Sequence, residues 1–272
     1  MSFGLKALGL VPKNTVSRIA GSFSRSKVSR SIIPWFVKTY NVNMDEAQVP
    51  EEGFKSLHQF FTRPLRDGMR PIAEAPLVSP ADGKIAQCGV VDDGLMVQAK
   101  GKDYSMSEML GEALHADEQG TDYAYATIYL APTDYHRLHS PADLLVESVY
   151  AVPGTLWPVN PMSVNGVDRL FCINERATLR CRTPEGYRVW VVFVGATIVG
   201  GIRLAFEPSY GSNLPERSTT ERYVYDQPIE LKAGDPMGHF ELGSTAVLVW
   251  DQALGKAMFD ENTPVCVGQA LT

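Results

Sequence analysis

The chain has 272 residues, of which 44% are apolar and 21% charged, with a formal net charge of −6 at pH 7. This composition suits a folded globular protein and excludes a chain that is disordered as a whole. The most apolar run, residues 189–202, is shorter than the roughly 20 residues of a membrane-spanning helix, so we expect no span. The apolar patch at residues 8–11 is too short for the core of a signal peptide and is broken by Pro12, so we expect no signal peptide either.

The N-terminal arm, residues 1–44, is basic and amphipathic. It holds seven Lys or Arg residues and no Asp or Glu, so the remainder of the chain carries −13. Apolar residues recur at helical spacing from Val16 to Phe23, and Pro34 is suited to begin another helix. We expect these helices to lie on a membrane surface and to attract anionic lipids. A basic helix packed on the body and a nucleic-acid-binding arm are the alternatives.

Residues 45–76 are expected to form a helix and a linker. The spacing of Phe54, Leu57 and Phe61 predicts a helix over residues 45–61. Three arginines follow in a turn-rich stretch. These residues, Arg63, Arg66 and Arg70, are expected to be solvated, and contact with an anionic head group is the alternative.

From residue 77 to residue 272, short apolar runs alternate with Gly, Pro and Asp turns, which predicts a β-rich antiparallel domain. The expected strands are residues 84–91, 95–100, 124–130, 144–152, 178–181 and 189–202, with one short helix over residues 105–114. Two more strands flank a tight bend at Gly243-Ser244. The fold class is therefore α+β, with an antiparallel β-rich core and amphipathic N-terminal helices. The four cysteines are scattered, which favours reduced thiols.

Three short stretches contain the residue types of a nucleophilic triad. Asp82 stands in an Asp-Gly turn, His136 and His139 are spaced three apart, and Ser244 follows Gly243. An Asp can orient an imidazole that takes the proton of an attacking Ser hydroxyl. The simpler interpretations are a turn at Asp82, a kinked strand at Gly243 and surface histidines without a role. Metal ligation by the two histidines is another option, but the sequence offers no third ligand of suitable spacing.

Eight short sequence motifs along the chain resemble those of a known family. They are residues 60–66 (FFTRPLR), 80–83 (PADG), 98–101 (QAKG), 134–139 (DYHRLH), 152–154 (VPG), 174–176 (NER), 194–200 (VGATIVG) and 242–245 (LGST). Together, and in this order, they resemble the bacterial type of phosphatidylserine decarboxylase, a pyruvoyl-dependent membrane enzyme made as a self-cleaving proenzyme. The resemblance extends over nearly the whole chain.

The resemblance implies that the precursor cuts its own Gly243-Ser244 bond. Asp82 and His139 would be the acid and base that activate Ser244, whose hydroxyl attacks the Gly243 carbonyl. Elimination from the resulting ester would leave a β chain of residues 1–243 and an α chain of residues 244–272. The α chain would begin with a covalent pyruvoyl cofactor derived from Ser244, and no metal is implied.

The resemblance also implies the reaction and the substrate pocket. The amine of phosphatidylserine would form a Schiff base with the pyruvoyl group, lose CO2 and leave as phosphatidylethanolamine. His136 would transfer a proton in the decarboxylation step. Val159 and Asn160 would belong to the substrate pocket, next to Pro158, where the family leads us to expect a small polar residue instead.

The implied location is the cytoplasmic side of the cell membrane, bound peripherally. The implied partners are phosphatidylserine, anionic lipids and a second processed protomer in a homodimer, with no nucleic acid. Two other functions remain open from the residues. One is a serine hydrolase with a conventional Asp82-His139-Ser244 triad, although the GxSxG pattern is absent. The other is a non-enzymatic β domain at the membrane surface.

Overall fold

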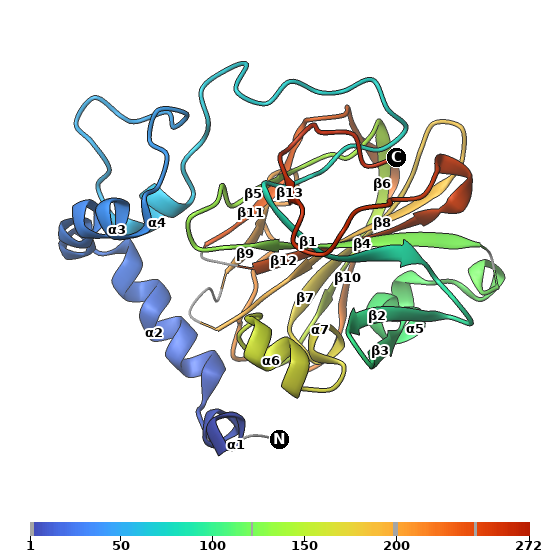
Figure 1. The fold of residues 1–272 in the computed structure, drawn as a ribbon, viewed down its shortest axis with the longest axis horizontal. Coiled ribbons are helices and arrows are strands. Elements are labelled where there is room, and N and C mark those ends of the chain that lie inside the picture. Colours follow the sequence, from blue (N-terminus) through green and yellow to red (C-terminus); the bar gives the residue numbers. More distant parts are fainter. Residues whose placement is uncertain (1–2, 121, 198–200, 242–243) are drawn as a thin grey trace.

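The computed structural model describes residues 3–120, 122–197, 201–241 and 244–272, and it confirms an α+β chain rich in antiparallel strands (Figure 1). The helices are α1 (Phe3–Gly9), α2 (Lys13–Arg25), α3 (Ile33–Tyr40), α4 (Leu57–Phe61), α5 (Met106–Leu110), α6 (Pro161–Gly166) and α7 (Leu170–Ile173), with 3-10 turns η1 (Lys27–Ile32), η2 (Gly111–Ala113), η3 (Ala116–Glu118) and η4 (Gln252–Leu254). The strands are β1 (Gly83–Val90), β2 (Leu95–Ala99), β3 (Lys102–Ser105), β4 (Tyr123–Leu130), β5 (Arg137–His139), β6 (Leu144–Val152), β7 (Arg176–Arg182), β8 (Arg188–Val194), β9 (Ile202–Leu204), β10 (Glu221–Leu231), β11 (Pro236–Phe240), β12 (Ser244–Asp251) and β13 (Pro264–Val265).

The largest sheet has eight strands in the order β10-β6-β7-β8-β12-β4-β1-β13, and every pair is antiparallel. Strand β12 lies inside it, between β8 and β4. A smaller sheet has the order β5-β11-β9. The two strands expected on either side of Gly243-Ser244 are therefore both present. They do not pair as a hairpin, because β11 belongs to the small sheet and β12 to the large one.

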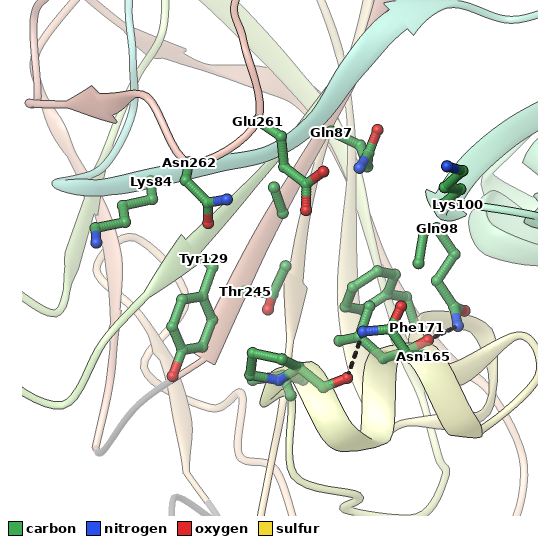
Figure 2. Close-up of a pocket in the computed structure, with 15 residues that line it drawn as sticks. Lys84, Gln87, Gln98, Lys100, Tyr129, Asn165, Phe171, Thr245, Glu261 and Asn262 are labelled. Carbon is green, nitrogen blue, oxygen red and sulfur yellow. Dashed lines mark hydrogen bonds between the residues drawn. The ribbon is translucent and has the colours of Figure 1, made fainter.

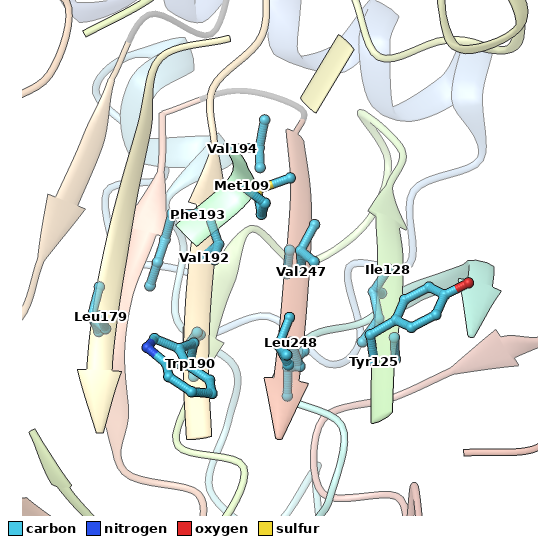
Figure 3. Packing of buried hydrophobic residues seen from close by; sticks show 14 of the residues in the cluster. Met109, Tyr125, Ile128, Leu179, Trp190, Val192, Phe193, Val194, Val247 and Leu248 are labelled. Carbon is cyan, nitrogen blue, oxygen red and sulfur yellow. The ribbon is translucent and has the colours of Figure 1, made fainter. Parts of the chain in front are cut away.

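The core surrounds the middle strands of the large sheet on both faces (Figure 3). Trp190 and Phe193 on β8 point to opposite faces, because side chains alternate along a strand. Trp190 donates from Nε1 to the Ala113 carbonyl in η2, at 2.9 Å. Phe193 packs against Phe240 of the small sheet, with ring centroids 5.4 Å apart. The run of buried β-branched and aromatic residues reflects burial of β8 on both sides.

Two predictions about secondary structure are wrong. Residues 45–61 do not form one helix, because Pro50 has no N–H to donate and Gly53 adopts a left-handed φ of +72°. Only α4 is helical there. It begins after Ser56, whose hydroxyl accepts a hydrogen bond from the Gln59 N–H. The expected strand over residues 189–202 is divided between β8 and β9, which lie in different sheets.

Strand β10 was not expected from the sequence. It contains several charged residues and Pro228, which do not resemble a central strand. Its place at the edge of the large sheet explains this composition, because an edge strand tolerates proline and charge and is protected by them from pairing with other chains. The expected short helix near residues 105–114 is present as α5 followed by η2.

The N-terminal arm is helical, as predicted, and α2 contacts the body through its small and polar side. Lys13, Ser17, Gly21 and Ser24 are the buried residues of α2. Asn14 donates from Nδ2 to the Gly154 carbonyl, at 3.0 Å. Within the described residues, we find no helix with the length and apolar character needed to cross a bilayer.

Candidate active site

The residues expected to carry chemistry gather at one end of the large sheet. Asp82 stands directly before β1, and Lys84 on β1 lies opposite Tyr129 on β4. The next residue of β4, Leu130, lies opposite Ser244, the first residue of β12. Neighbouring strands are about 4.8 Å apart, so the starts of β1 and β12 are separated by roughly 10 Å across β4.

The small sheet brings the two histidines of the DYHRLH segment to the same end. Gly243 lies outside the described residues, and Ser244 is described through its backbone but not its side chain. The Phe240 N–H, at the end of β11, donates to the His136 carbonyl at 2.9 Å, whereas His139 lies opposite Pro236. Four residues of extended chain span about 13 Å. The backbone of His136 is thus nearer than that of His139 to the end of β11 that leads to Gly243.

His136 is completely buried, and the described part of the chain leaves one of its ring nitrogens without a partner. Its Nδ1 donates to the Asp134 carbonyl at 2.7 Å, and its ring meets Phe61 edge-on. Its Nε2 has no hydrogen-bond partner among the residues that the structure describes. Burial lowers the pKa of His136 to about 4. The imidazole is therefore neutral near pH 7, with a lone pair on Nε2 that can accept a proton.

The imidazole of His139 is held at both nitrogens. Nδ1 faces the Gly234 carbonyl at 2.7 Å and must donate to it, so Nε2 accepts from the Tyr135 hydroxyl at 2.9 Å. The two rings also stack, with centroids 5.6 Å apart. Burial lowers the pKa of His139, and the nearby Asp82 charge acts in the opposite direction. His139 is therefore a neutral base with a fixed tautomer.

Asp82 is oriented by an arginine rather than by His139. Arg70 donates from Nε to both carboxylate oxygens, at 2.9 and 3.1 Å, and the Val267 N–H donates to Oδ1 at 2.9 Å. Arg70 also binds Glu46. Asp82 and His139 are nevertheless neighbours, because the His139 N–H donates to the Pro80 carbonyl. The contacts described for the two side chains do not include a hydrogen bond between them.

The expectation that the linker arginines are solvated is wrong for two of the three. Arg70 is bound to Asp82 and Glu46, and Arg63 is only 4% exposed, with its guanidinium 4.9 Å from the centre of the Phe60 ring. The sequence carries no local signal for the Arg70 contact, because its partner lies 12 residues away and is brought close only by the fold.

A cavity of about 150 Å³ adjoins the start of β12 (Figure 2). Thr245 lies in the middle of its wall, with Tyr129 and Lys84 on one side and Gln98 and Lys100 on the other. The buried Thr245 hydroxyl has no hydrogen-bond partner within the described part of the chain. The cavity is therefore lined by two lysines and by the Thr245 hydroxyl, one residue from Ser244, which the described residues leave without a partner.

The two residues expected in the substrate pocket differ in position. Val159 lines this cavity. Asn160 caps α6 instead, its side-chain oxygen accepting from the Ser163 N–H at 3.0 Å. Gln98 shapes the opposite wall, because its amide donates to the carbonyls of Val164 and Val167 and thereby holds the end of α6.

Comparison with known proteins gives a consistent result. Residues 57–272 match the phosphatidylserine decarboxylase family. The chain is 41% identical to the phosphatidylserine decarboxylase proenzyme of Dechloromonas aromatica (strain RCB), over 89% of this chain and 86% of that protein. It is 42% identical to that of Anaeromyxobacter sp. (strain K), over 94% and 91% of the two chains. It is 39% identical to that of Chromobacterium violaceum, over 96% and 95%.

Proposed function

This chain belongs to the phosphatidylserine decarboxylase family, and we propose that it converts phosphatidylserine to phosphatidylethanolamine and CO2 with a group made from its own Ser244. The observation that carries this proposal is the gathering of Asp82, His136, His139 and the backbone of Ser244 at one end of the sheet. Sequence similarity gives the reaction, and this arrangement supports the residues that we assign to it.

We propose self-cleavage as the first reaction of the site. The Ser244 hydroxyl attacks the Gly243 carbonyl and gives its proton to an imidazole, and the chain passes through an ester. Formation of the ester breaks the C–N bond between Gly243 and Ser244 and leaves an amine on Ser244. Elimination then removes the Ser244 Cα proton to a base and breaks the bond between Ser244 Cβ and its oxygen, so that Gly243 keeps a carboxylate. Hydrolysis of the remaining dehydroalanine releases ammonia and leaves a pyruvoyl group. His139 suits the base, because it is neutral and its Nε2 carries the lone pair.

The surroundings of Ser244 fit a small carbonyl group that binds an amine. The cavity beside Thr245 supports this fit, as do Thr245 Oγ1 and His136 Nε2, for which the described residues provide no hydrogen-bond partner. A pyruvoyl ketone supplies a carbonyl for the substrate amine and takes up the electron pair left by CO2. His136 is neutral near pH 7, so it would first take up a proton at Nε2, and its lowered pKa would then favour release of that proton to the carbon that lost CO2.

We assign substrate binding to the same cavity. Its volume of about 150 Å³ suits a polar head group and leaves the acyl chains outside. Lys84 and Lys100 would attract the phosphate, and the Thr245 hydroxyl would hydrogen-bond to a head-group oxygen. Val159 would pack against the head group, whereas Asn160 would act indirectly by holding the start of α6.

We propose that the N-terminal arm binds the membrane peripherally, at its cytoplasmic side. The apolar side of α2 is turned away from the body: Ile19 is 66% exposed and Phe23 is 46% exposed, whereas Ser17 and Ser24 are buried. Further along the arm, Val28 and Trp35 are also exposed. An outward apolar face beside basic residues is typical of helices at a bilayer interface.

We further propose that two processed protomers form a homodimer. The side chain of Val224 on β10, which is 63% exposed, supports a contact between side chains of the two protomers, whereas the charges and Pro228 of β10 disfavour pairing of its edge with another strand. Sedimentation analysis of the purified protein tests the association.

The mass of the denatured protein tests the proposed function. We expect a chain of residues 1–243 and a chain of residues 244–272 that begins with a pyruvoyl group. The Ser244→Ala variant should remain full-length and inactive. A full-length wild-type protein with activity toward fluorophosphonate probes would support a serine hydrolase instead, and an uncut, unreactive protein would support a non-enzymatic domain.

Variants of the two histidines separate their roles. His139→Ala should block cutting, because the Ser244 hydroxyl then has no base. His136→Ala should be cut and should decarboxylate slowly, by about 10² to 10⁴-fold for loss of a general acid or base. If the His136→Ala variant is cut and then decarboxylates at the wild-type rate, the role assigned to His136 is wrong.

A further inference from the structure

A buried carboxylate lies just before the bond that we propose is cut. Glu241 follows β11 directly and precedes Gly243 by two residues, yet it is only 4% exposed. Its N–H donates to the Gly201 carbonyl at 2.9 Å, which fixes its backbone. Its carboxylate packs against Gly201, where a side chain would collide with it at 2.2 Å. Both the backbone and the side chain of Glu241 are thus held in place.

Two arginines bind this carboxylate. Arg25, the last residue of α2, forms an ion pair with Oε2, and Arg203 on β9 approaches Oε1 at 3.5 Å. The Arg25 guanidinium lies across Gly21, on the side of α2 that faces the body. A buried carboxylate needs such partners, since an unpaired charge in the interior is strongly unfavourable. Glu241 therefore connects α2 to the end of β11.

Helix α4 meets the same cluster. The pKa of His58 on α4 is lowered, mainly by burial. The Glu241 charge opposes this shift and the Arg25 charge adds to it, so both charges lie close to His58. The arm, α4 and β11 thus share one group of charges around the buried Glu241 carboxylate, in which Arg25 and Arg203 remain partly exposed. The outer side of α2 is the side that we assign to the membrane, so the cluster lies between the membrane-binding arm and the cleavage site.

We infer that Glu241 and Arg25 are positioning residues for self-cleavage, and that their ion pair makes the geometry of the Gly243-Ser244 bond depend on the docking of α2. The inference rests on the proposed function. Attack of a hydroxyl on a carbonyl requires the reacting atoms to be about 3 Å apart and aligned, and a displacement of 1 Å costs on the order of 100-fold in rate. Only Leu242 stands between Glu241 and Gly243, so we expect a rotation of the Glu241 backbone to displace the Gly243 carbonyl by a distance of this order.

The pair should matter for maturation more than for turnover. Before cutting, the end of β11 and the start of β12 belong to one continuous chain, so a displacement of the Glu241 backbone should also displace the backbone at Ser244. After cutting, β11 ends freely and β12 remains held by β4 and β8. Weakening the ion pair should therefore slow cutting and leave the kcat of the cut enzyme close to that of the wild type.

Cell-free synthesis followed by denaturing electrophoresis measures the rate of cutting of the newly made chain. We expect Arg25→Gln and Glu241→Gln each to slow cutting by about tenfold or more. The double variant should cut no more slowly than Glu241→Gln alone, because both changes remove one interaction. Arg25→Lys keeps the charge and should cut nearly as fast as the wild type. Arg30→Gln removes the same charge from an exposed position of the arm and is the matched control.

Three results would overturn the inference: cutting of both single variants at the wild-type rate, additive slowing in the double variant, or a fall in kcat of the cut variants equal to the fall in cutting rate. Melting temperatures of all variants on a Ser244→Ala background show whether the fold is retained. If the wild-type chain itself is never cut, the proposed function fails and the inference fails with it. If the wild type is cut and the variants behave normally, only the inference fails.

Discussion

His136 and His139 stand three residues apart and differ in what their ring nitrogens contact. His136 is buried, and no described residue contacts its Nε2 by a hydrogen bond, whereas His139 has both nitrogens bound, one by Tyr135. The free lone pair of His136 suits a group that takes up and releases a proton during turnover. The fixed ring of His139 suits a single reaction that requires one tautomer and one orientation.

Burial of His136 should make the stability of the fold depend on pH. Its pKa is about 4 in the folded state and about 6.5 in the unfolded chain. The unfolded chain therefore binds more protons between these values, and stability falls as the pH falls from about 6.5 to 4. On an uncut Ser244→Ala background, His136→Gln should reduce the loss of unfolding free energy between pH 7 and pH 4.5 by about 2 kcal/mol. Urea titrations at both pH values measure this, and equal losses with and without His136 would contradict it.

The Tyr135 hydroxyl occupies the nitrogen of His139 that should act as the base. Direct transfer of the Ser244 proton to Nε2 requires this hydrogen bond to break. We therefore expect Tyr135→Phe, which keeps the ring stacking, to cut itself at least as fast as the wild type and to lose about 1 kcal/mol of stability. Time courses of cutting measure the effect. Loss of cutting would instead mean that the Tyr135 hydroxyl itself carries the proton.

At the scale of elements, β12 decides how the cut protein holds together. It pairs along its length with β4 and β8, and its residues from Ala246 to Trp250 are completely buried. Two of these residues, Val247 and Leu248, lie in the centre of the packed core (Figure 3). The proposed cut thus falls at the first residue of a strand whose remaining length is fixed by two partners.

We expect the α chain to remain bound after cutting. Native size-exclusion chromatography should elute both chains together, and urea should separate them in the transition that unfolds the sheet. Leu248→Ala should lower the urea midpoint through a loss of about 3 kcal/mol of unfolding free energy, because it leaves a cavity in the core against one face of β12. Separate elution of the short chain under native conditions would contradict the central place of β12.

At the scale of the whole molecule, a basic arm lies on an acidic body. The seven charged residues among residues 1–44 are all Lys or Arg, whereas the chain as a whole has a net charge of −6. Figure 1 shows the blue N-terminal helices along one side of the molecule, beside the β-rich body. The arm thus concentrates positive charge and exposed apolar side chains in one region of an otherwise acidic protein.

Binding to vesicles should depend on the outer side of α2. Phe23→Asp should weaken binding to vesicles with anionic lipids by roughly tenfold or more, since burial of a Phe side chain contributes about 1.5 to 3 kcal/mol. Ser22→Asp makes the same change of charge at a neighbouring exposed position and should have a smaller effect, which added salt removes. Co-sedimentation with vesicles measures both. Equal effects of the two variants would mean that charge alone holds the arm.

The sequence by itself determined the family, the α+β class, most of the strands and the residues expected to react, because turn residues, β-branched runs and short motifs are local properties of the chain. Only the tertiary structure showed that Arg70 holds Asp82, that Tyr135 binds His139, and that Glu241 joins α2 to β11. Each of these contacts depends on the fold: Arg70 and Asp82 are 12 residues apart, and Arg25 and Glu241 are 216 apart. Spacing along the chain predicts which residues can react, whereas their partners, burial and orientation arise when distant segments pack together.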